Sequence, residues 1–220
     1  MRAVVIGAGG GVGRQVVTAA TAAGHEVVAA ARDVPDYLPV GARAVTVDVR
    51  DGAAVAAVVR GADAVAWCVG VSARSGPDVA RQGMAHLVAA AEPGLRVVSV
   101  SGAGADLPGD TKGVGARLVS ALTHRLAADL VTDKEGEHAV LAASDLAWTQ
   151  VRPPRLVDAA PAGGWQLGER APGLRAAPLP RADVAAAVLD LLTTTAWVRR
   201  APFLLAGPAA SAAAGSGDRA

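Results

Sequence analysis

The sequence has few aromatic residues, a single cysteine and almost no net charge. Aromatic side chains make up 3% of the 220 residues although 52% are hydrophobic, so valine, leucine and alanine must fill the interior. That composition is typical of helices packed on parallel strands. The one cysteine, Cys68, excludes an internal disulfide and any site built from several cysteines, and it is compatible with a reducing compartment.

The low charge and the short apolar runs exclude further classes of partner. A formal net charge of +1 gives no basic field for nucleic acid and no polybasic anchor for lipid. The N-terminal apolar run covers only residues 3–6, and no uncharged apolar run approaches the roughly 20 residues that span a bilayer. We therefore expect a cytoplasmic protein that binds neither nucleic acid nor membrane. Its oligomeric state stays open, with a monomer as one alternative.

The first thirty-three residues have the pattern of a strand, a glycine-rich turn, a helix and a second strand. Residues 3–6 suit a strand buried on both faces, and five glycines follow between positions 7 and 13. Helical spacing then continues to Gly24, and residues 27–31 form the next apolar run. This unit predicts an α/β protein with a doubly wound, mostly parallel sheet in three αβα layers, which is a Rossmann fold.

The glycine-rich turn is a candidate site for a pyrophosphate. The first amides of a helix lack intrahelical partners and carry partial positive charge, and glycine lets a phosphate approach the backbone. The usual dinucleotide fingerprint would need glycine at position 12, which is Val12, whereas Gly7, Gly10 and Gly13 are each separated by two residues. We predict that a dinucleotide contacts this turn at Gly7, Gly10, Gly11, Val12, Gly13 and Arg14.

The end of the second strand indicates which dinucleotide binds. An acid there hydrogen-bonds the ribose 2'-hydroxyl of NADH, whereas an arginine accommodates the 2'-phosphate of NADPH. The chain has Arg32 followed by Asp33, and Arg14 could add a second cation. Because a guanidinium binds phosphate oxygens in a bidentate fork, the sequence favours NADPH, with NAD(H) as the alternative.

The rest of the chain continues the alternation of strands and helices. Strands are expected over residues 44–47, 63–69, 95–100, 146–151 and 202–206, and helices over 53–60, 77–91, 114–127, 128–143 and 181–193. Pro77 and Asp78 suit a helix start, and Asp51 suits a helix cap. Residues 1–208 form one predicted domain, with a loop-rich flap over the substrate at 155–180, and residues 209–220 are predicted to be a disordered tail.

Residues at the carboxyl ends of the strands are further candidates, because ligands of doubly wound sheets lie beyond those ends. Val69 and Gly70 are expected to face the nicotinamide half of the cofactor. Ser99 and Ser101 end the fifth strand, although Ser101 could instead cap that strand end. Arg152 and Pro153 end the sixth, and a structural ion pair is the alternative for Arg152. No metal site is predicted.

Four further stretches resemble one branch of the atypical short-chain dehydrogenase/reductase superfamily, which the glycine spacing also resembles. They are residues 98–101, 133–138, 144–153 and 181–185. In this order they are similar to the NmrA-like group, which includes biliverdin reductase B-like and flavin reductase-like proteins. The resemblance covers most of the chain and implies a Rossmann fold with bound NAD(P). It also implies that Asp48 and Val49 meet the adenine ring, with Asp48 as a turn or cap residue the alternative.

This chain departs from the superfamily at the proton donor. Ordinary short-chain reductases use a tyrosine that is acidified by a lysine four residues later. Lys134 matches the lysine, which implies that it binds the nicotinamide ribose, but Leu130 stands at the tyrosine position and the only tyrosine is Tyr37. Without an acid, ketone reduction would lose about 3 to 5 kcal/mol of transition-state stabilisation.

A flavin-like or quinone-like acceptor can delocalise the incoming charge and take its proton from water. We therefore expect an NADPH-dependent reductase of such a small molecule, in which Ser101 donates a hydrogen bond to the acceptor or the nicotinamide. Two alternatives stay open. One is a non-catalytic NmrA-like protein that senses NAD(P) and contacts a partner protein, and the other is an NAD(P)-dependent epimerase or isomerase.

Overall fold

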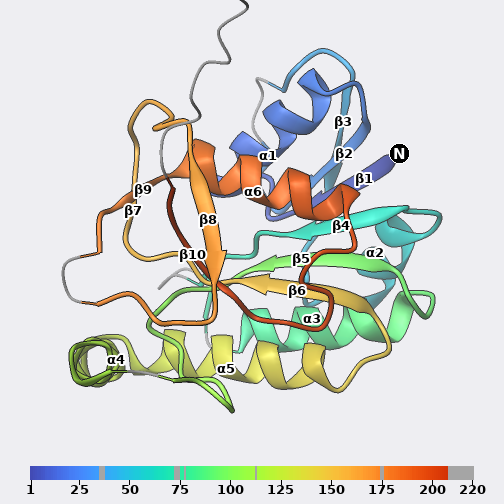
Figure 1. The fold of residues 1–220 in the computed structure, drawn as a ribbon. Coiled ribbons are helices and arrows are strands. Elements are labelled where there is room, and N and C mark those ends of the chain that lie inside the picture. Colours follow the sequence, from blue (N-terminus) through green and yellow to red (C-terminus); the bar gives the residue numbers. More distant parts are fainter. Residues whose placement is uncertain (35–37, 72–74, 77, 112, 174–175, 208–220) are drawn as a thin grey trace, which may run out of the picture.

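A sheet of six parallel strands forms the centre of the molecule (Figure 1). The computed structural model describes residues 1–34, 38–71, 75–76, 78–111, 113–173 and 176–207. The strand order is β3-β2-β1-β4-β5-β6, and each neighbouring pair is parallel. The strands are β1 (Arg2–Ile6), β2 (Glu26–Ala31), β3 (Ala42–Thr46), β4 (Ala64–Trp67), β5 (Arg96–Val100) and β6 (Ala147–Val151). The predicted doubly wound fold is confirmed.

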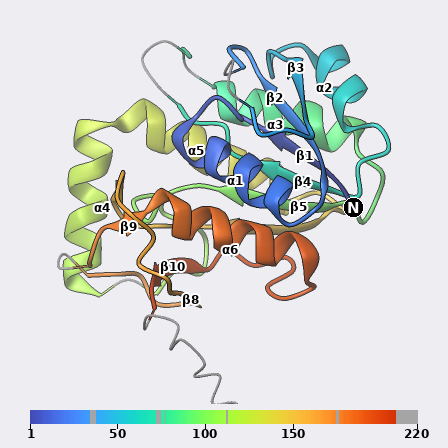
Figure 2. The same ribbon diagram turned by 90° about the horizontal axis from the view of Figure 1, so that it is seen from above.

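Helices cover both faces of this sheet (Figures 1 and 2). On one face, α1 (Gly11–Ala22) packs against α6 (Arg181–Thr193). On the other face lie α2 (Gly52–Val59), α3 (Val79–Ala90) and α5 (Ala128–Ala142), and α4 (Val114–Leu126) contacts α5. One apolar cluster fills each of the two layers, mostly from valine, alanine and leucine. No helix in the described ranges has the length and apolar character to cross a membrane.

The helices on the α3 face begin in two different ways. The predicted cap of α2 is confirmed, since Asp51 Oδ1 accepts hydrogen bonds from the amides of Ala53 at 2.9 Å and Ala54 at 3.1 Å. At α3, Pro77 lies outside the described residues and the Asp78 side chain caps nothing. Instead, Asp133 of α5 accepts hydrogen bonds from the first-turn amides of α3, at 2.9 and 2.8 Å. A carboxylate from a neighbouring helix therefore caps α3 and ties it to α5.

The stretch from residue 155 to 180 differs from the predicted loop-rich flap, because it contains three short strands. They are β7 (Leu156–Val157), β8 (Trp165–Gly168) and β9 (Leu179–Pro180). β7 pairs with β9, and β8 pairs antiparallel with β10 (Phe203–Ala206). β10 therefore stands outside the main sheet, and an isolated bridge joins its Phe203 to Arg152, the residue after β6. The tail predicted over residues 209–220 lies outside the described residues.

Candidate functional site

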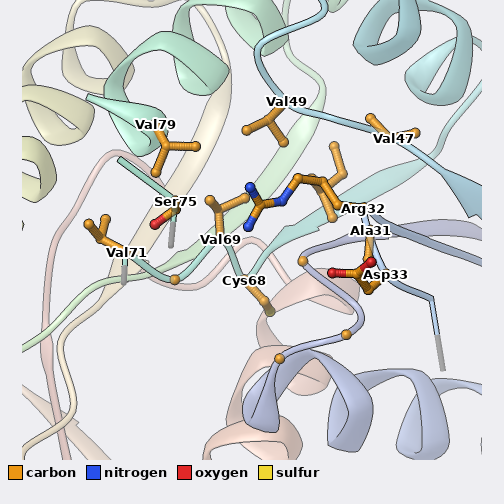
Figure 3. Close-up of a pocket in the computed structure, with 15 residues that line it drawn as sticks. Ala31, Arg32, Asp33, Val47, Val49, Cys68, Val69, Val71, Ser75 and Val79 are labelled. Atoms are coloured by element: carbon orange, nitrogen blue, oxygen red, sulfur yellow. The ribbon is translucent and has the colours of Figure 1, made fainter. Parts of the chain in front are cut away.

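A pocket of about 290 Å³ lies where β1, β2 and β4 end (Figure 3). The glycine-rich turn, the end of β2 and the segment after β4 supply its walls. Its apolar lining includes Val47, Val49, Val69 and Val79. The residues that were predicted from the sequence and that line it are Gly7, Gly10, Arg32, Val49, Val69 and Gly70. The pocket thus lies at the carboxyl ends of the strands, as the topology requires.

The glycine-rich turn is shaped by contacts within the protein before any ligand is considered. Gly7 has a φ of +87°, and a Cβ there would lie 2.4 Å from the carbonyl oxygen of Cys68. A Cβ on Gly13 would lie 2.2 Å from the carbonyl oxygen of Gly7. These two glycines therefore let β1, its turn and α1 pack closely against one another and against the end of β4.

The start of α1 has the properties of an anion site. Gly10 is its N-cap, none of the described side chains caps the first amides, and its first turn contains no acidic residue. These amides carry partial positive charge and lack intrahelical carbonyl partners. A diphosphate fits this helix end, because Gly10 has no side chain that would block its approach to the amides. The residues present therefore suit the predicted dinucleotide.

Sequence reasoning missed a cation at this helix end. A Cβ on Gly11 would lie 2.6 Å from Nε of Arg181, so the Arg181 side chain passes directly over the first residue of α1. Its Nη1 pairs with Oδ1 of Asp158 at 2.7 Å, and the Asp158 side chain is 89% exposed. The sequence signals were the predicted start of α6 and the family resemblance of residues 181–185, and neither could place Arg181 beside α1.

The end of β2 presents a cation and an anion to the same pocket. Arg32 and Asp33 both line it and both are exposed. The Arg32 guanidinium extends across the pocket toward Val69, whereas Asp33 stays beside Ala31 (Figure 3). The pocket therefore has a group for a 2'-phosphate and a group for a 2'-hydroxyl at one strand end.

Asp48 and Arg14 are among the predicted cofactor residues that do not line the pocket. Asp48 is exposed, and its Oδ1 accepts a hydrogen bond from the amide of Arg50 at 3.0 Å. This is the turn role that the sequence left open as the alternative to an adenine contact. Arg14 is exposed on α1. Val49, next to Asp48, does line the pocket.

Lys134 lies between the ends of β4 and β5, and protein acceptors surround its ammonium. Nζ donates to the carbonyl oxygens of Val69 at 2.8 Å and Val100 at 3.2 Å, and to Oε2 of Glu137 at 2.7 Å. An ammonium has three protons, so each has an acceptor within the protein. The predicted contact with a nicotinamide ribose would have to replace one of these bonds.

A hydrogen bond to Glu137 explains the position of the Ser99 side chain. The Glu137 carboxylate is fully buried, and Oε1 accepts hydrogen bonds from Ser99 Oγ at 2.6 Å and from Gln150 Nε2 at 3.2 Å. Ser99 is itself fully buried and lies apart from the pocket. This placement replaces its predicted cofactor contact with a structural role, in which Ser99 helps to satisfy a buried charge.

The hydroxyl of Ser101, which was predicted to donate a hydrogen bond to a ligand, is not used by another described residue. Ser101 follows β5, and its Oγ is buried without a hydrogen-bond partner among the described residues. A buried hydroxyl without a partner costs about 1–3 kcal/mol. Leu130, at the position of the usual tyrosine acid, is 37% exposed on α5. Ser101 is not among the residues that line the pocket, and Leu130 removes the usual acid from the chain.

Cys68 lines the pocket as a neutral thiol. Burial raises the pKa of this thiol to about 12, and the nearby Lys134 ammonium offsets only part of that effect. A thiol with so high a pKa carries almost no thiolate at neutral pH and is a poor nucleophile. The chemistry of the pocket therefore does not depend on Cys68.

Arg152 and Pro153 lie away from the pocket. The Arg152 guanidinium is buried, donates to both carboxylate oxygens of Asp110 at 2.6 and 2.7 Å, and stacks 3.8 Å from the ring centroid of Phe203. These contacts match the structural ion pair that the sequence left open as the alternative for Arg152. They replace the predicted cofactor role. Pro153 is also buried, and its carbonyl oxygen accepts a hydrogen bond from the amide of Ala103.

The sequence matches a known family over most of its length. Residues 7–195 match the family described as NAD(P)H-binding. Among curated proteins, uncharacterised proteins of Mycobacterium tuberculosis and Mycobacterium bovis are 43% identical over 75 residues. That stretch is 34% of this chain and 9% of theirs, so the chain spans only a small part of these relatives.

Solved structures with the same fold come from several bacteria. A short-chain dehydrogenase/reductase from Veillonella parvula in complex with NADP has a TM-score of 0.75 and 19% identity, with 94% of each chain covered. The anaerobillin reductase ChuY of Escherichia coli O157:H7 has a TM-score of 0.73 and 23% identity, covering 95% of this chain and 100% of its own.

A protein of Streptococcus pneumoniae that has been proposed to be an NADH-flavin reductase is also similar. It has a TM-score of 0.74 and 20% identity, and the similarity covers 94% of this chain and 100% of that one. At such identities the likeness shows the fold alone, whereas the family match rests on the sequence itself. Together with the glycine-rich turn at the carboxyl end of β1, that match shows that the chain belongs to the NAD(P)H-binding family.

Proposed function

We propose that this protein transfers hydride from NADPH to a flat conjugated acceptor that resembles a flavin or a quinone. The observation that carries the proposal is the buried hydroxyl of Ser101, which has no partner among the described residues, in a chain that has Leu130 at the position of the usual tyrosine acid. Such a site can donate a hydrogen bond to an acceptor but cannot readily protonate an isolated ketone oxygen. An acceptor that spreads the incoming charge over a conjugated ring system does not need that acid.

Residues of this chain would hold the two reactants in place. The amides at the start of α1 would hold the diphosphate, with the Arg181 side chain beside Gly11 as a nearby cation. Arg32 would bind the 2'-phosphate, and Val47 and Val49 give the pocket an apolar wall for the adenine. When bound, the nicotinamide supplies a hydride. Ser101 would donate a hydrogen bond to the acceptor atom on which negative charge develops, and water would supply the proton.

Two of the structural relatives support this class of acceptor. One is named as an anaerobillin reductase, and another has been proposed to reduce flavin with NADH. A flavin is a flat conjugated acceptor. Because these structures are at most 23% identical to this chain, they support the proposal only as relatives of the same fold.

The contacts of Lys134 favour a second candidate function. With all three ammonium protons given to protein acceptors, this lysine holds β4 and β5 together without needing a cofactor. A non-catalytic protein that binds NAD(P) and reports its redox state to a partner protein would keep this arrangement. It would bind cofactor without consuming it.

Turnover measurements distinguish the two candidates. We would titrate NADPH and NADH into the purified protein and then follow NADPH oxidation with FMN, riboflavin, a naphthoquinone, a linear tetrapyrrole and a simple cyclic ketone. We expect tighter binding of NADPH, turnover with at least one conjugated acceptor, and none with the ketone. Tighter binding of NADH would contradict the cofactor choice. Cofactor binding without turnover of any acceptor would favour the sensor, and absence of binding would reject both.

A further inference from the structure

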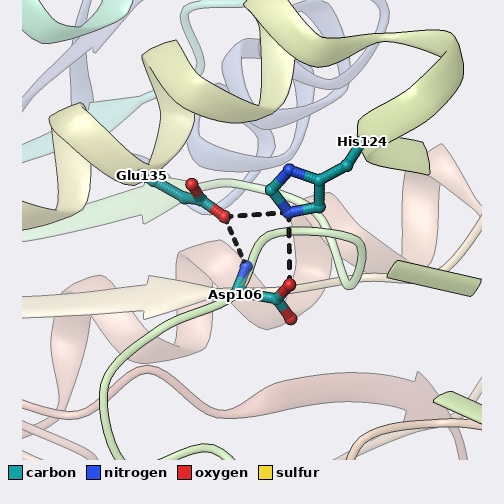
Figure 4. A group of neighbouring side chains, drawn as sticks. All are labelled: Asp106, His124 and Glu135. Atoms are coloured by element: carbon teal, nitrogen blue, oxygen red, sulfur yellow. Dashed lines mark hydrogen bonds and ion pairs between the residues drawn. The ribbon is translucent and has the colours of Figure 1, made fainter. Parts of the chain in front are cut away.

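A second cluster of titratable side chains lies outside the nucleotide pocket (Figure 4). Asp106 comes from the loop after β5, His124 from the last turn of α4, and Glu135 from α5. One ligand atom from each lies within 4.8 Å of the other two. The proposed reductase uses none of these three residues, and sequence analysis found no metal site because they are distant from one another in the chain.

Both carboxylates converge on one nitrogen of His124. Oδ2 of Asp106 and Oε1 of Glu135 each lie 3.2 Å from Nε2. This nitrogen is buried, yet neither contact has the alignment of a hydrogen bond. The two oxygens therefore flank Nε2 (Figure 4). An ion placed between Nε2 and the two oxygens would meet all three atoms.

The spacing of these atoms fits a small transition-metal ion. With bonds of about 2.0–2.1 Å in a tetrahedral site, neighbouring ligand atoms stand roughly 3.3–3.4 Å apart. The two nitrogen–oxygen distances of 3.2 Å are close to that edge length. One imidazole and two carboxylates also form a mixed donor set that Zn²⁺ accepts, whereas Ca²⁺ and Mg²⁺ prefer oxygen ligands alone.

The cluster is partly fixed in place and is open to solvent. The amide of Asp106 donates a hydrogen bond to Oε1 of Glu135 at 2.8 Å, which holds the loop and the α5 carboxylate together. The exposed fractions of the side chains are 50% for Asp106, 35% for His124 and 28% for Glu135. An ion could therefore enter without unfolding of the chain, and water could fill the fourth position.

We propose that Asp106, His124 and Glu135 bind a divalent transition-metal ion of the Zn²⁺ class. The ion would join α4, α5 and the loop that begins at Ser101. Its role would be to fix that loop beside the substrate end of the sheet. The proposal is independent of the reductase function, since it needs neither cofactor nor turnover.

Metal binding to the 220-residue chain without an affinity tag tests this site. After chelator treatment, we would measure Zn²⁺ uptake by calorimetry and Co²⁺ uptake by its visible absorption bands. We expect one equivalent of metal per chain, tetrahedral Co²⁺ bands and a higher melting temperature with Zn²⁺. His124→Asn should weaken binding at least about tenfold, since even residues behind metal ligands affect affinity by that much. His25→Asn, which changes a histidine outside the cluster, should bind as the wild type does.

Glu135→Gln and Asp106→Asn remove one ligand charge with little change of shape. They should also weaken binding, and they keep the test decisive if His124→Asn fails to fold. Absence of stoichiometric uptake, or equal uptake by the wild type and all three cluster variants, would overturn the metal site. The three side chains would then form only a cluster of polar contacts around His124.

Discussion

At the scale of single residues, the hydroxyl of Ser101 can be tested without disturbing the fold. In Ser101→Ala the acceptor would lose a hydrogen bond to developing charge, so kcat/KM should fall about 10- to 100-fold. Because Oγ has no partner among the described residues, the free energy of unfolding should stay the same or rise slightly. Steady-state kinetics with the best acceptor and urea denaturation measure the two effects. Unchanged kinetics would remove Ser101 from the mechanism.

Arg181 is the second residue whose role can be isolated. The diphosphate is common to both nicotinamide cofactors, so Arg181→Ala should raise the Kd of NADPH and of NADH alike, by roughly tenfold. The estimate is modest because the side chain is 28% exposed and solvent screens its charge. Asp158→Asn is the matched control, since it removes the competing carboxylate and should leave binding equal or tighter. Weaker binding by Asp158→Asn, or no effect of Arg181→Ala, would show that the pair is only structural.

At the scale of elements, the Lys134–Glu137 pair should hold α5 to the ends of β4 and β5. Lys134→Met leaves the fully buried Glu137 carboxylate without its cation, which should cost about 3–5 kcal/mol of unfolding free energy. Lys134→Met combined with Glu137→Gln removes the buried charge as well and should recover part of that loss. Chemical denaturation at pH 7 checks both values. A loss below about 1 kcal/mol in the single variant would contradict a buried structural pair.

Elements with a strong local pattern could be predicted, and elements that depend on distant partners could not. The valine- and alanine-rich runs of β1 and β2 are buried strands, and Asp51 caps α2 as its sequence neighbours indicate. In contrast, β8 is a four-residue strand among glycines and prolines, and its partner β10 lies more than thirty residues later. The cap of α3 comes from Asp133 on another helix, and no pattern around α3 contains that information.

At the scale of the whole molecule, topology explains which site residues could be predicted. Parallel strands end at one edge of the sheet, so the turn after β1 and the residues after β4 were placed together correctly. A strand end does not reveal where a side chain points, however. Ser99 points into the buried network of Glu137, and Arg152 turns toward Asp110. Arg181 was missed because only the tertiary packing of α6 on α1 brings it to the turn.

The same buried network should make the stability of the molecule depend on pH through His138. Nδ1 of this histidine lies 2.9 Å from Oε1 of Gln150, while the Gln150 amide donates to Glu137. Nδ1 must therefore donate, and the neutral ring satisfies the bond. Burial is the main cause that lowers the pKa of His138 from its ordinary value of 6.5. As the pH falls through about 6.5, His138 takes up a proton in the unfolded chain more readily than in the folded chain. The contribution of His138 to the unfolding free energy is therefore present above that pH and is lost progressively below it.

We expect the unfolding free energy of the wild type to fall more steeply between pH 7.5 and pH 5 than that of His138→Asn, whose amide can still donate to Gln150 but does not titrate. Urea denaturation at several pH values measures both slopes. The other histidines are present in both proteins, so their contributions cancel in the difference. A difference that does not change with pH would show that His138 has the same pKa folded and unfolded, and that the network tolerates an imidazolium.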